Sequence, residues 1–166
     1  IRDHNFRAIY GNWAYLKTYM KDKYGKYKLA YLSYNAGKRE SYRLIGDVLL
    51  TGIDVKNKVD YPDAIVTATW GIDLHYPDKR NSKYFPGEEF IAYAVHPDKR
   101  KDVYTFPYRC LYSRNIENLF MAGRNISVTH IALGTVRVQR TTGMMGEVIG
   151  LAAFLCSKNH CSPRQL

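Results

Sequence analysis

The chain has 166 residues, of which 46% are hydrophobic, and its formal net charge at pH 7 is +10. This length and composition suit one ordinary domain with a hydrophobic core and exclude an intrinsically disordered protein. No apolar run reaches the roughly 18 residues that a membrane-spanning helix needs, so no membrane partner is expected.

Two helices are predicted in the first third of the chain. Residues 13–24 (WAYLKTYMKDKY) place large apolar side chains at steps of three and four, which forms one face of a helix. A second helix is predicted over residues 41–50, with Ser41 as its N-cap and with an inner side formed by Leu44, Ile45, Val48 and Leu49.

The middle and the end of the chain combine strands with one helix. Residues 64–70, 90–96 and 103–106 are rich in β-branched and aromatic residues and are bounded by prolines, which is typical of strands. A further short strand is predicted at 118–123, and a helical pattern follows at 142–155. The predicted fold class is therefore mixed α+β.

The last predicted helix has an unusual face. Gly143, Gly146 and Gly150 fall within roughly 60° of arc at the α-helical step, so this face carries no side chains. Each glycine costs about 1 kcal/mol relative to alanine inside a helix, so close approach of a backbone or of a flat ligand is expected. Thr141 and Thr142 are candidate caps, and we expect the helix to be largely buried.

The cysteines and the basic charge indicate no additional class of site. Cys110, Cys156 and Cys161 are odd in number and form no CxxC, so neither a disulfide framework nor a metal site is expected. The lysines and arginines are scattered in short groups in turn-like surroundings, as at 21–28 and 98–101. Such charge is typical of solvated loops, so no nucleic-acid partner is expected, although a basic nucleic-acid-binding module stays an alternative.

Four blocks together resemble a known family. Residues 117–153 (ENLFMAGRNISVTHIALGTVRVQRTTGMMGEVIGLAA) resemble the C-terminal flavin-binding segment of FAD-dependent oxidoreductases with the glutathione-reductase type of FAD domain. Residues 37–55, 62–78 and 106–119 resemble, in order, upstream segments of one branch of that family, whose members have been labelled xanthan-lyase-like. The resemblance implies a flavoprotein with FAD as its cofactor.

The chain also departs from this family. Such proteins bind the FAD pyrophosphate at a GxGxxG turn in a βαβ unit, and this chain contains no GxG. The resemblance therefore implies the C-terminal portion of a two-domain flavoprotein, whose partner is the missing N-terminal part of the same polypeptide. Residues 1–112 would end the substrate or cap domain, and residues 113–166 would complete the FAD domain. FAD binding by this portion alone is expected to be weak or absent.

The resemblance assigns six residues to FAD binding: Ala122, Gly123, Arg124, Thr142, Gly143 and Met144. The first three would form the turn after the last strand, where the backbone approaches the ribityl chain and the pyrophosphate. The last three would lie at a helix N-terminus facing the pyrimidine edge of the flavin, where N–H groups stabilise the negative charge of the reduced ring.

Five residues are candidates for catalysis or substrate binding. Asp73 and His75 lie two apart, so in a strand they share one face, and the carboxylate can orient the imidazole for proton transfer. His130 lies in the segment expected near the flavin and is a candidate ligand or acid/base. Arg39 and Arg109 are candidates for binding an anionic or polyhydroxylated substrate.

Other readings of the same residues stay open. Glu40 is expected to pair within the fold, and Arg137 and Arg140 either meet phosphate or are solvated. A polysaccharide lyase of the xanthan type is an alternative function, in which a base and a charge neutraliser act next to a uronate carboxyl. The substrate is expected to be a small molecule or a carbohydrate, and a homodimer through residues 119–155 is a further expectation.

Overall fold

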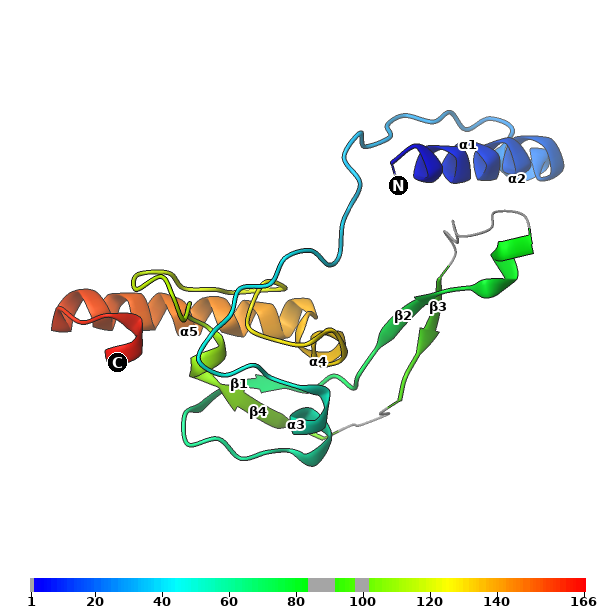
Figure 1. Ribbon diagram of the computed structural model, residues 1–166. Coiled ribbons are helices and arrows are strands. Elements are labelled where there is room, and N and C mark those ends of the chain that lie inside the picture. Colours follow the sequence, from blue (N-terminus) through cyan, green and yellow to red (C-terminus); the bar gives the residue numbers. More distant parts are fainter. Residues whose placement is uncertain (1, 84–91, 98–101) are drawn as a thin grey trace. The chain divides into compact units, whose positions relative to one another are not determined.

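The computed structural model describes residues 2–83, 92–97 and 102–166 (Figure 1). The chain divides into two compact units, one of Ile1–Lys38 with Pro77–Tyr93 and one of Arg39–Tyr76 with Ala94–Leu166. Helices and short antiparallel strands confirm the predicted mixed α+β class. None of the helices in the described part of the chain is both long enough and apolar enough to span a bilayer.

The first unit contains α1 (Arg2–Tyr19) and α2 (Lys21–Tyr24), together with the 3-10 helix η1 (Lys79–Lys83). The helix predicted over residues 13–24 is confirmed and begins earlier, at Arg2. Neither α1 nor α2 has a buried residue. The Lys17 ammonium donates to backbone carbonyls of the turn after α2, which fixes the end of α1 against that turn.

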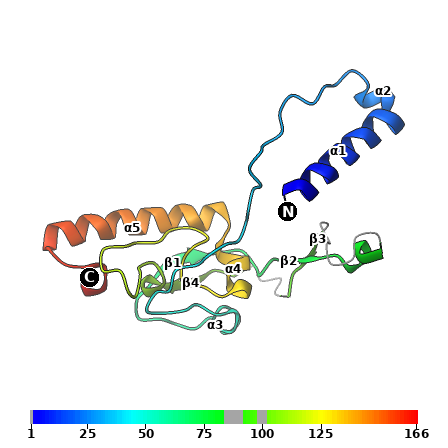
Figure 2. The same cartoon turned by 45° about the horizontal axis from the view of Figure 1, so that its top comes forward.

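The second unit contains the hydrophobic core. Its elements are α3 (Gly52–Asn57), β1 (Ala64–Ala68), β4 (Tyr104–Pro107), η2 (Tyr108–Cys110), α4 (His130–Val136), α5 (Gln139–Asn159) and η3 (Pro163–Gln165). β1 and β4 pair antiparallel, and α5 lies along this sheet in both views (Figures 1 and 2). β2 (Leu74–Pro77) and β3 (Ala92–Val95) form a second two-stranded sheet, within which the boundary between the units falls.

Burial is concentrated where α4, α5 and the β1–β4 sheet meet. Fully buried side chains of this core include Val66, Phe106, Leu111, Ile126, Val128, Val136 and Met145. Phe106 and Val66 face each other in the β1–β4 register, so the sheet presents its large apolar side chains to α5. The strands predicted at 64–70 and 103–106 are confirmed as β1 and β4, and β3 confirms residues 92–95 of the strand predicted at 90–96.

The helix predicted over residues 41–50 is wrong, because this segment is extended and pairs with a distant part of the chain. Leu44 N–H donates to Asn125 O at 2.9 Å, and Leu50 bridges Val128 in a parallel arrangement. Of the four residues expected to face inward, Ile45 and Leu49 are 59% and 50% exposed. The other two, Leu44 and Val48, are partly buried against the core. These long-range backbone bonds replace the hydrogen bonds that a helix would have made.

Two further differences concern the segment between β4 and α5. The strand predicted at 118–123 consists only of Phe120, in an isolated antiparallel bridge to Tyr112. Helix α4 was not predicted, and it begins at the Thr129 cap, whose hydroxyl accepts from Ala132 N–H. The chain in this region is held by core burial of side chains rather than by a continuous ladder of backbone bonds.

The helix predicted over residues 142–155 is confirmed as α5, which runs farther in both directions. The expectation that it is largely buried is wrong, because its buried residues are only Thr141, Met145 and Ala152. A Cβ added to Gly143, Gly146 or Gly150 would meet no described atom within 4 Å. The glycine face of α5 therefore faces open space in this unit.

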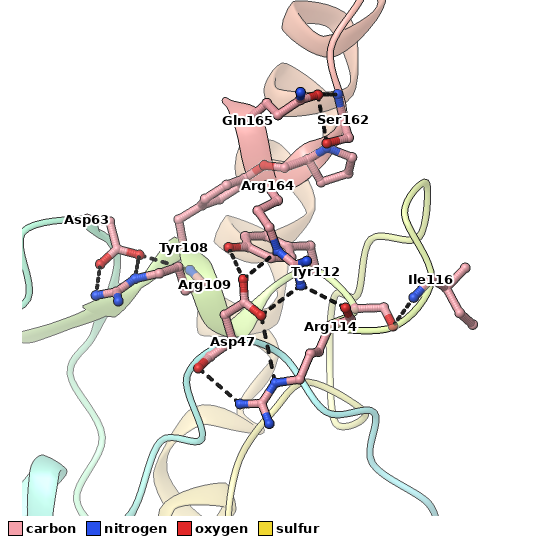
Figure 3. A network of polar contacts seen from close by, with 12 residues as sticks. Asp47, Asp63, Tyr108, Arg109, Tyr112, Arg114, Ile116, Ser162, Arg164 and Gln165 are labelled. Carbon is pink, nitrogen blue, oxygen red and sulfur yellow. Dashed lines mark hydrogen bonds and ion pairs between the residues drawn. The ribbon is translucent and has the colours of Figure 1, made fainter.

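An ionic network joins η3 to the loop that holds Asp47 (Figure 3). Arg164 donates to both Asp47 oxygens at 2.8 Å, and the Tyr112 hydroxyl donates to Asp47 Oδ2 at 2.8 Å. The hydrogen bond from Arg164 is the main cause that lowers the pKa of Asp47. Burial, followed by the Asp47 carboxylate, raises the pKa of Tyr112 to about 12, so its hydroxyl keeps the donated proton.

We expect Asp47→Asn to lower the free energy of unfolding by about 1–2 kcal/mol at pH 7, since charge-assisted hydrogen bonds are lost. Because the pKa of Asp47 is lowered in the folded state, its ionised carboxylate stabilises the fold fully at pH values above about 4, the ordinary pKa of an aspartate. This stabilisation is lost as the pH falls below about 4 and passes through the lowered pKa of Asp47 in the folded state. Thermal unfolding of wild type and Asp47→Asn, measured between pH 7 and pH 2, should show that the difference between their unfolding temperatures disappears at low pH.

The matched control is Asp60→Asn, which changes the same group at an exposed position. We expect it to leave the unfolding temperature unchanged across the same pH range. An Asp47→Asn variant as stable as the control at pH 7 would contradict a stabilising role for the network.

Candidate active site

Four of the five residues proposed for catalysis come together beside α4. A cavity of about 150 Å³ lies in the second unit. Its polar lining is formed by Arg39, Glu40, Asp73, His75, His130 and Arg137. Leu74, Leu133 and Gly134 complete the wall, so the cavity has an apolar side as well as a charged one.

The absence of a side chain at Gly134 brings α4 against the start of β2. A Cβ at Gly134 would lie 2.7 Å from the Asp73 carbonyl oxygen, which no real contact permits. His130 is the first residue of α4 and Arg137 is its C-cap, seven residues later. Because seven residues make about two helical turns, both side chains lie on the same face of α4. The packing at Gly134 thus places this face beside Asp73 and His75.

Asp73 is the acceptor at the centre of the cluster. Its Oδ2 lies 3.3 Å from His75 Nε2 and accepts from Arg137 Nη2 at 3.2 Å. Its Oδ1 is buried without a hydrogen-bond partner among the described residues, and His96 Nδ1 lies 3.6 Å away. The predicted pairing of Asp73 with His75 is therefore present in the structure, together with a guanidinium partner.

A second carboxylate and imidazole pair lies across the same cavity. His130 Nδ1 lies 2.7 Å from Glu40 Oε2, and Arg43 also donates to Glu40. Burial raises the pKa of Glu40, but its hydrogen bonds to Arg43 and His130 outweigh this, so the pKa is lowered. A carboxylate bound to one ring nitrogen orients the imidazole and leaves the other nitrogen available for proton transfer.

Two arginines, Arg39 and Arg137, line the cavity. The pKa of Arg137 is lowered, first by burial and then by the charge of Arg39, with a smaller effect from Arg124. These guanidinium groups are therefore close enough to repel one another. The Asp73 carboxylate acts in the opposite direction and raises the pKa of Arg137.

Arg109 is not part of this cluster. It forms a bidentate ion pair with Asp63, with distances of 3.0 Å from Nε to Oδ2 and 2.8 Å from Nη2 to Oδ1 (Figure 3). This pair ties η2 to the loop before β1, so the guanidinium is already engaged in the fold. In the lyase alternative, Arg109 would therefore not be at the cavity to neutralise the charge of the substrate.

Sequence reasoning missed the place of Glu40 and Arg137 in the site. The signal for Arg137 was its seven-residue spacing from His130, which becomes visible once residues 130–136 are assigned to a helix. No local pattern places Glu40 near His130, because 90 residues separate the two.

The turn assigned to the cofactor contains a glycine with positive φ. Gly123 has φ of +109°, a conformation that L side chains rarely adopt. Its N–H donates to the sulfur of the buried Met145 at 3.2 Å, which holds the turn against α5. Ala122 is half-buried and Arg124 is exposed, so one side of the turn is open to a ligand.

The start of α5 differs in register from the expectation. Its N-cap is Val138, without a side-chain hydrogen bond, and the first turn has no acidic residue. Thr142, Gly143 and Met144 therefore lie in the second turn, and Thr142 N–H already donates to Val138 O. The candidate caps Thr141 and Thr142 do not cap, because Thr141 is buried and the Thr142 hydroxyl donates to Gln139 O.

The residues present fit an anionic, flat cofactor. The uncapped first turn of α5 offers N–H groups to an anion, as helix N-termini do. The positive-φ glycine lets a ligand approach the backbone, and the glycine face of α5 leaves further room beside it.

Comparison with known proteins defines the family. The family model described as FAD dependent oxidoreductase matches residues 2–166. The chain therefore belongs to the FAD-dependent oxidoreductase family, whose members use FAD to transfer electrons. No curated protein and no solved structure matches the chain.

Proposed function

We propose that this chain supplies one edge of the flavin site and the substrate pocket of an FAD-dependent oxidoreductase. The observation that carries the proposal is the family match over residues 2–166. The positive φ of Gly123 and the uncapped start of α5 support it, since both suit contact with a phosphorylated flavin. The proposal includes the glutathione-reductase type of FAD domain and the xanthan-lyase-like branch, on the residues of 117–153.

In this proposal the residues of the cavity handle the proton of the reaction. FAD, when bound, supplies the acceptor for a hydride. His75 is held at Nε2 by Asp73 and His130 at Nδ1 by Glu40, so each keeps one ring nitrogen for a substrate proton. Arg137 and the first-turn N–H groups of α5 add positive potential, which favours negative charge on a reduced ring.

The proposal also divides the FAD site between two parts of a polypeptide. The chain has no GxG turn for the pyrophosphate, so the dinucleotide end would be held by a βαβ unit outside these 166 residues. The glycine face of α5, open in this unit, would then meet that unit or the flavin. Alone, the chain would present only part of the pocket and would be inactive.

A titration of FAD tests this division. We expect the 166-residue chain to bind FAD at least about 100-fold more weakly than a longer protein that includes the GxGxxG unit, since most phosphate contacts are missing. Flavin fluorescence measured during the titration gives both affinities. Tight, stoichiometric binding by the 166-residue chain would overturn the division, and no saturable binding by the longer protein would overturn the flavin assignment.

A further inference from the structure

We propose that Cys156 and Cys161 form a thiol–disulfide site at the end of α5, which a small disulfide such as oxidised glutathione converts to an intramolecular disulfide. Both are free thiols in the structure. Three features carry the inference: a backbone turn that brings the two cysteines together, anchors on either side of that turn, and access from solvent. The site is separate from the cavity beside α4, so the inference does not depend on the proposed function.

The turn at the end of α5 folds Cys161 back over Cys156. His160 is the C-cap, with φ of 52° in the left-handed region, and its N–H donates to Cys156 O. Cys161 N–H donates to the same carbonyl at 3.1 Å. In helix ends of this kind, the side chains that stand in the positions of Cys156 and Cys161 commonly contact each other. The 3.1 Å bond also limits the separation of the two Cα atoms to about 7 Å, and a disulfide spans about 4.4–6.8 Å.

The electrostatic neighbours of the two thiols place them on the same side of this turn. Burial raises the pKa of Cys156, and the charge of Cys161 and a hydrogen bond with it add to the effect. The pKa of Tyr108 is also raised, first by burial and then by Cys156, with a smaller effect from Cys161. Because one tyrosine in η2 interacts with both cysteines, their sulfur atoms lie in one place beside η2.

The segment that carries Cys161 is anchored at both ends. Before it, the α5 cap fixes His160, and after it the Tyr108 hydroxyl donates to Pro163 O at 2.9 Å. The η3 helix is closed by the capping box of Ser162 and Gln165 (Figure 3). Two thiols held in this way have a high effective concentration toward each other, which favours closure of a disulfide over retention of a mixed one.

Access distinguishes this pair from the third cysteine. Cys156 and Cys161 are half-buried, and residues 157–160 between them are exposed, so a small disulfide can approach the turn. Cys110 is fully buried, and burial is the main cause that raises its pKa to about 12. A thiol in such surroundings is inert, so Cys110 serves as an internal control.

The exchange balances in two steps. The Cys161 thiolate attacks one sulfur of oxidised glutathione, which forms a mixed disulfide and releases one glutathione thiolate. Cys156 then loses its proton, and its sulfur attacks that of Cys161, which breaks the mixed disulfide and releases the second glutathione. We assign the first attack to Cys161 because the raised pKa keeps Cys156 protonated at neutral pH. Two protein thiols are oxidised, and one glutathione disulfide is reduced to two thiols that take up the two protons.

Peptide mapping of the intact protein after treatment with oxidised glutathione tests the proposal. Lys158 lies between the two cysteines, so trypsin separates residues 141–158 from residues 159–164. After alkylation and digestion, we expect these two peptides to remain joined by a disulfide that carries no glutathione, in a protein that stays monomeric on a non-reducing gel. Cys110 should be alkylated. Unlinked peptides, stable glutathione adducts on both cysteines, or a disulfide that joins two chains would overturn the proposal.

Single replacements measure the contribution of ring closure. In Cys156→Ser and Cys161→Ser, half-modification at a fixed concentration of reduced glutathione should need at least about tenfold more oxidised glutathione than in the wild type, because no second sulfur is held nearby. The product should then be a glutathione adduct. Ser157→Ala is the matched control, since it changes an exposed residue of the same turn and keeps both thiols. We expect it to be oxidised within about twofold of the wild-type concentration. Equal requirements in all four proteins would overturn the proposed pairing.

Discussion

Replacement of Gly46 by alanine is expected to destabilise the protein by about 3 kcal/mol or more, as forced overpacking of a rigid core does. Gly46 is buried, and an added Cβ would lie 2.4 Å from the Arg109 carbonyl oxygen and 3.0 Å from that of Tyr112. Both atoms belong to backbone, so neither can rotate away. The same Arg109 carbonyl accepts from Val48 N–H at 3.3 Å, so the displacement would also disturb this hydrogen bond.

Gly11→Ala is the matched control for this substitution. Gly11 lies inside α1, and a Cβ there would meet no described atom within 4 Å. We expect this variant to be stabilised by up to about 1 kcal/mol through helix propensity. Urea unfolding of both variants measures the contrast. Equal stabilities of the two variants would show that the loop around Gly46 can shift to accommodate a methyl group, which would contradict the close packing described above.

Elements with a strong local pattern were predictable from the sequence. α5 repeats apolar residues at helical steps, and β1 and β4 are short β-branched and aromatic runs next to prolines. Residues 41–50 show the limit of such reasoning, because their apolar spacing also suits a helix. Their conformation is decided by pairing with residues 125–129, and no local pattern reports a partner that distant.

The candidate site shows the same division between local and long-range information. Asp73 and His75 were paired from a spacing of two residues, and the structure places them 3.3 Å apart. The identity of the partner of Arg109 was not predictable, because Asp63 lies 46 residues away and the two meet only through the β1–β4 register. Arg39 joins the cluster in the same way, through contacts of the folded chain rather than a motif.

Combined replacement of Gly143, Gly146 and Gly150 by alanine is expected to stabilise the chain and to impair FAD binding. Each position lies inside α5 with open space where a Cβ would be, so helix propensity should add about 1 kcal/mol per site. The proposed function places the flavin, or the unit that holds its phosphates, against this face. Three added methyl groups would then hold the backbone away from its partner, because tight packing does not tolerate them.

The two effects are measured on different molecules. Thermal unfolding of the 166-residue chain reports the gain in stability, and FAD titration of a longer protein with the GxGxxG unit reports the loss of affinity. Ser157→Ala, an exposed change on the same helix, is the control and should alter neither by much. A stabilised triple variant that binds FAD as tightly as wild type would place the flavin elsewhere. A destabilised one would mean that this face packs against other residues of the chain, and the glycines would then serve folding rather than the cofactor.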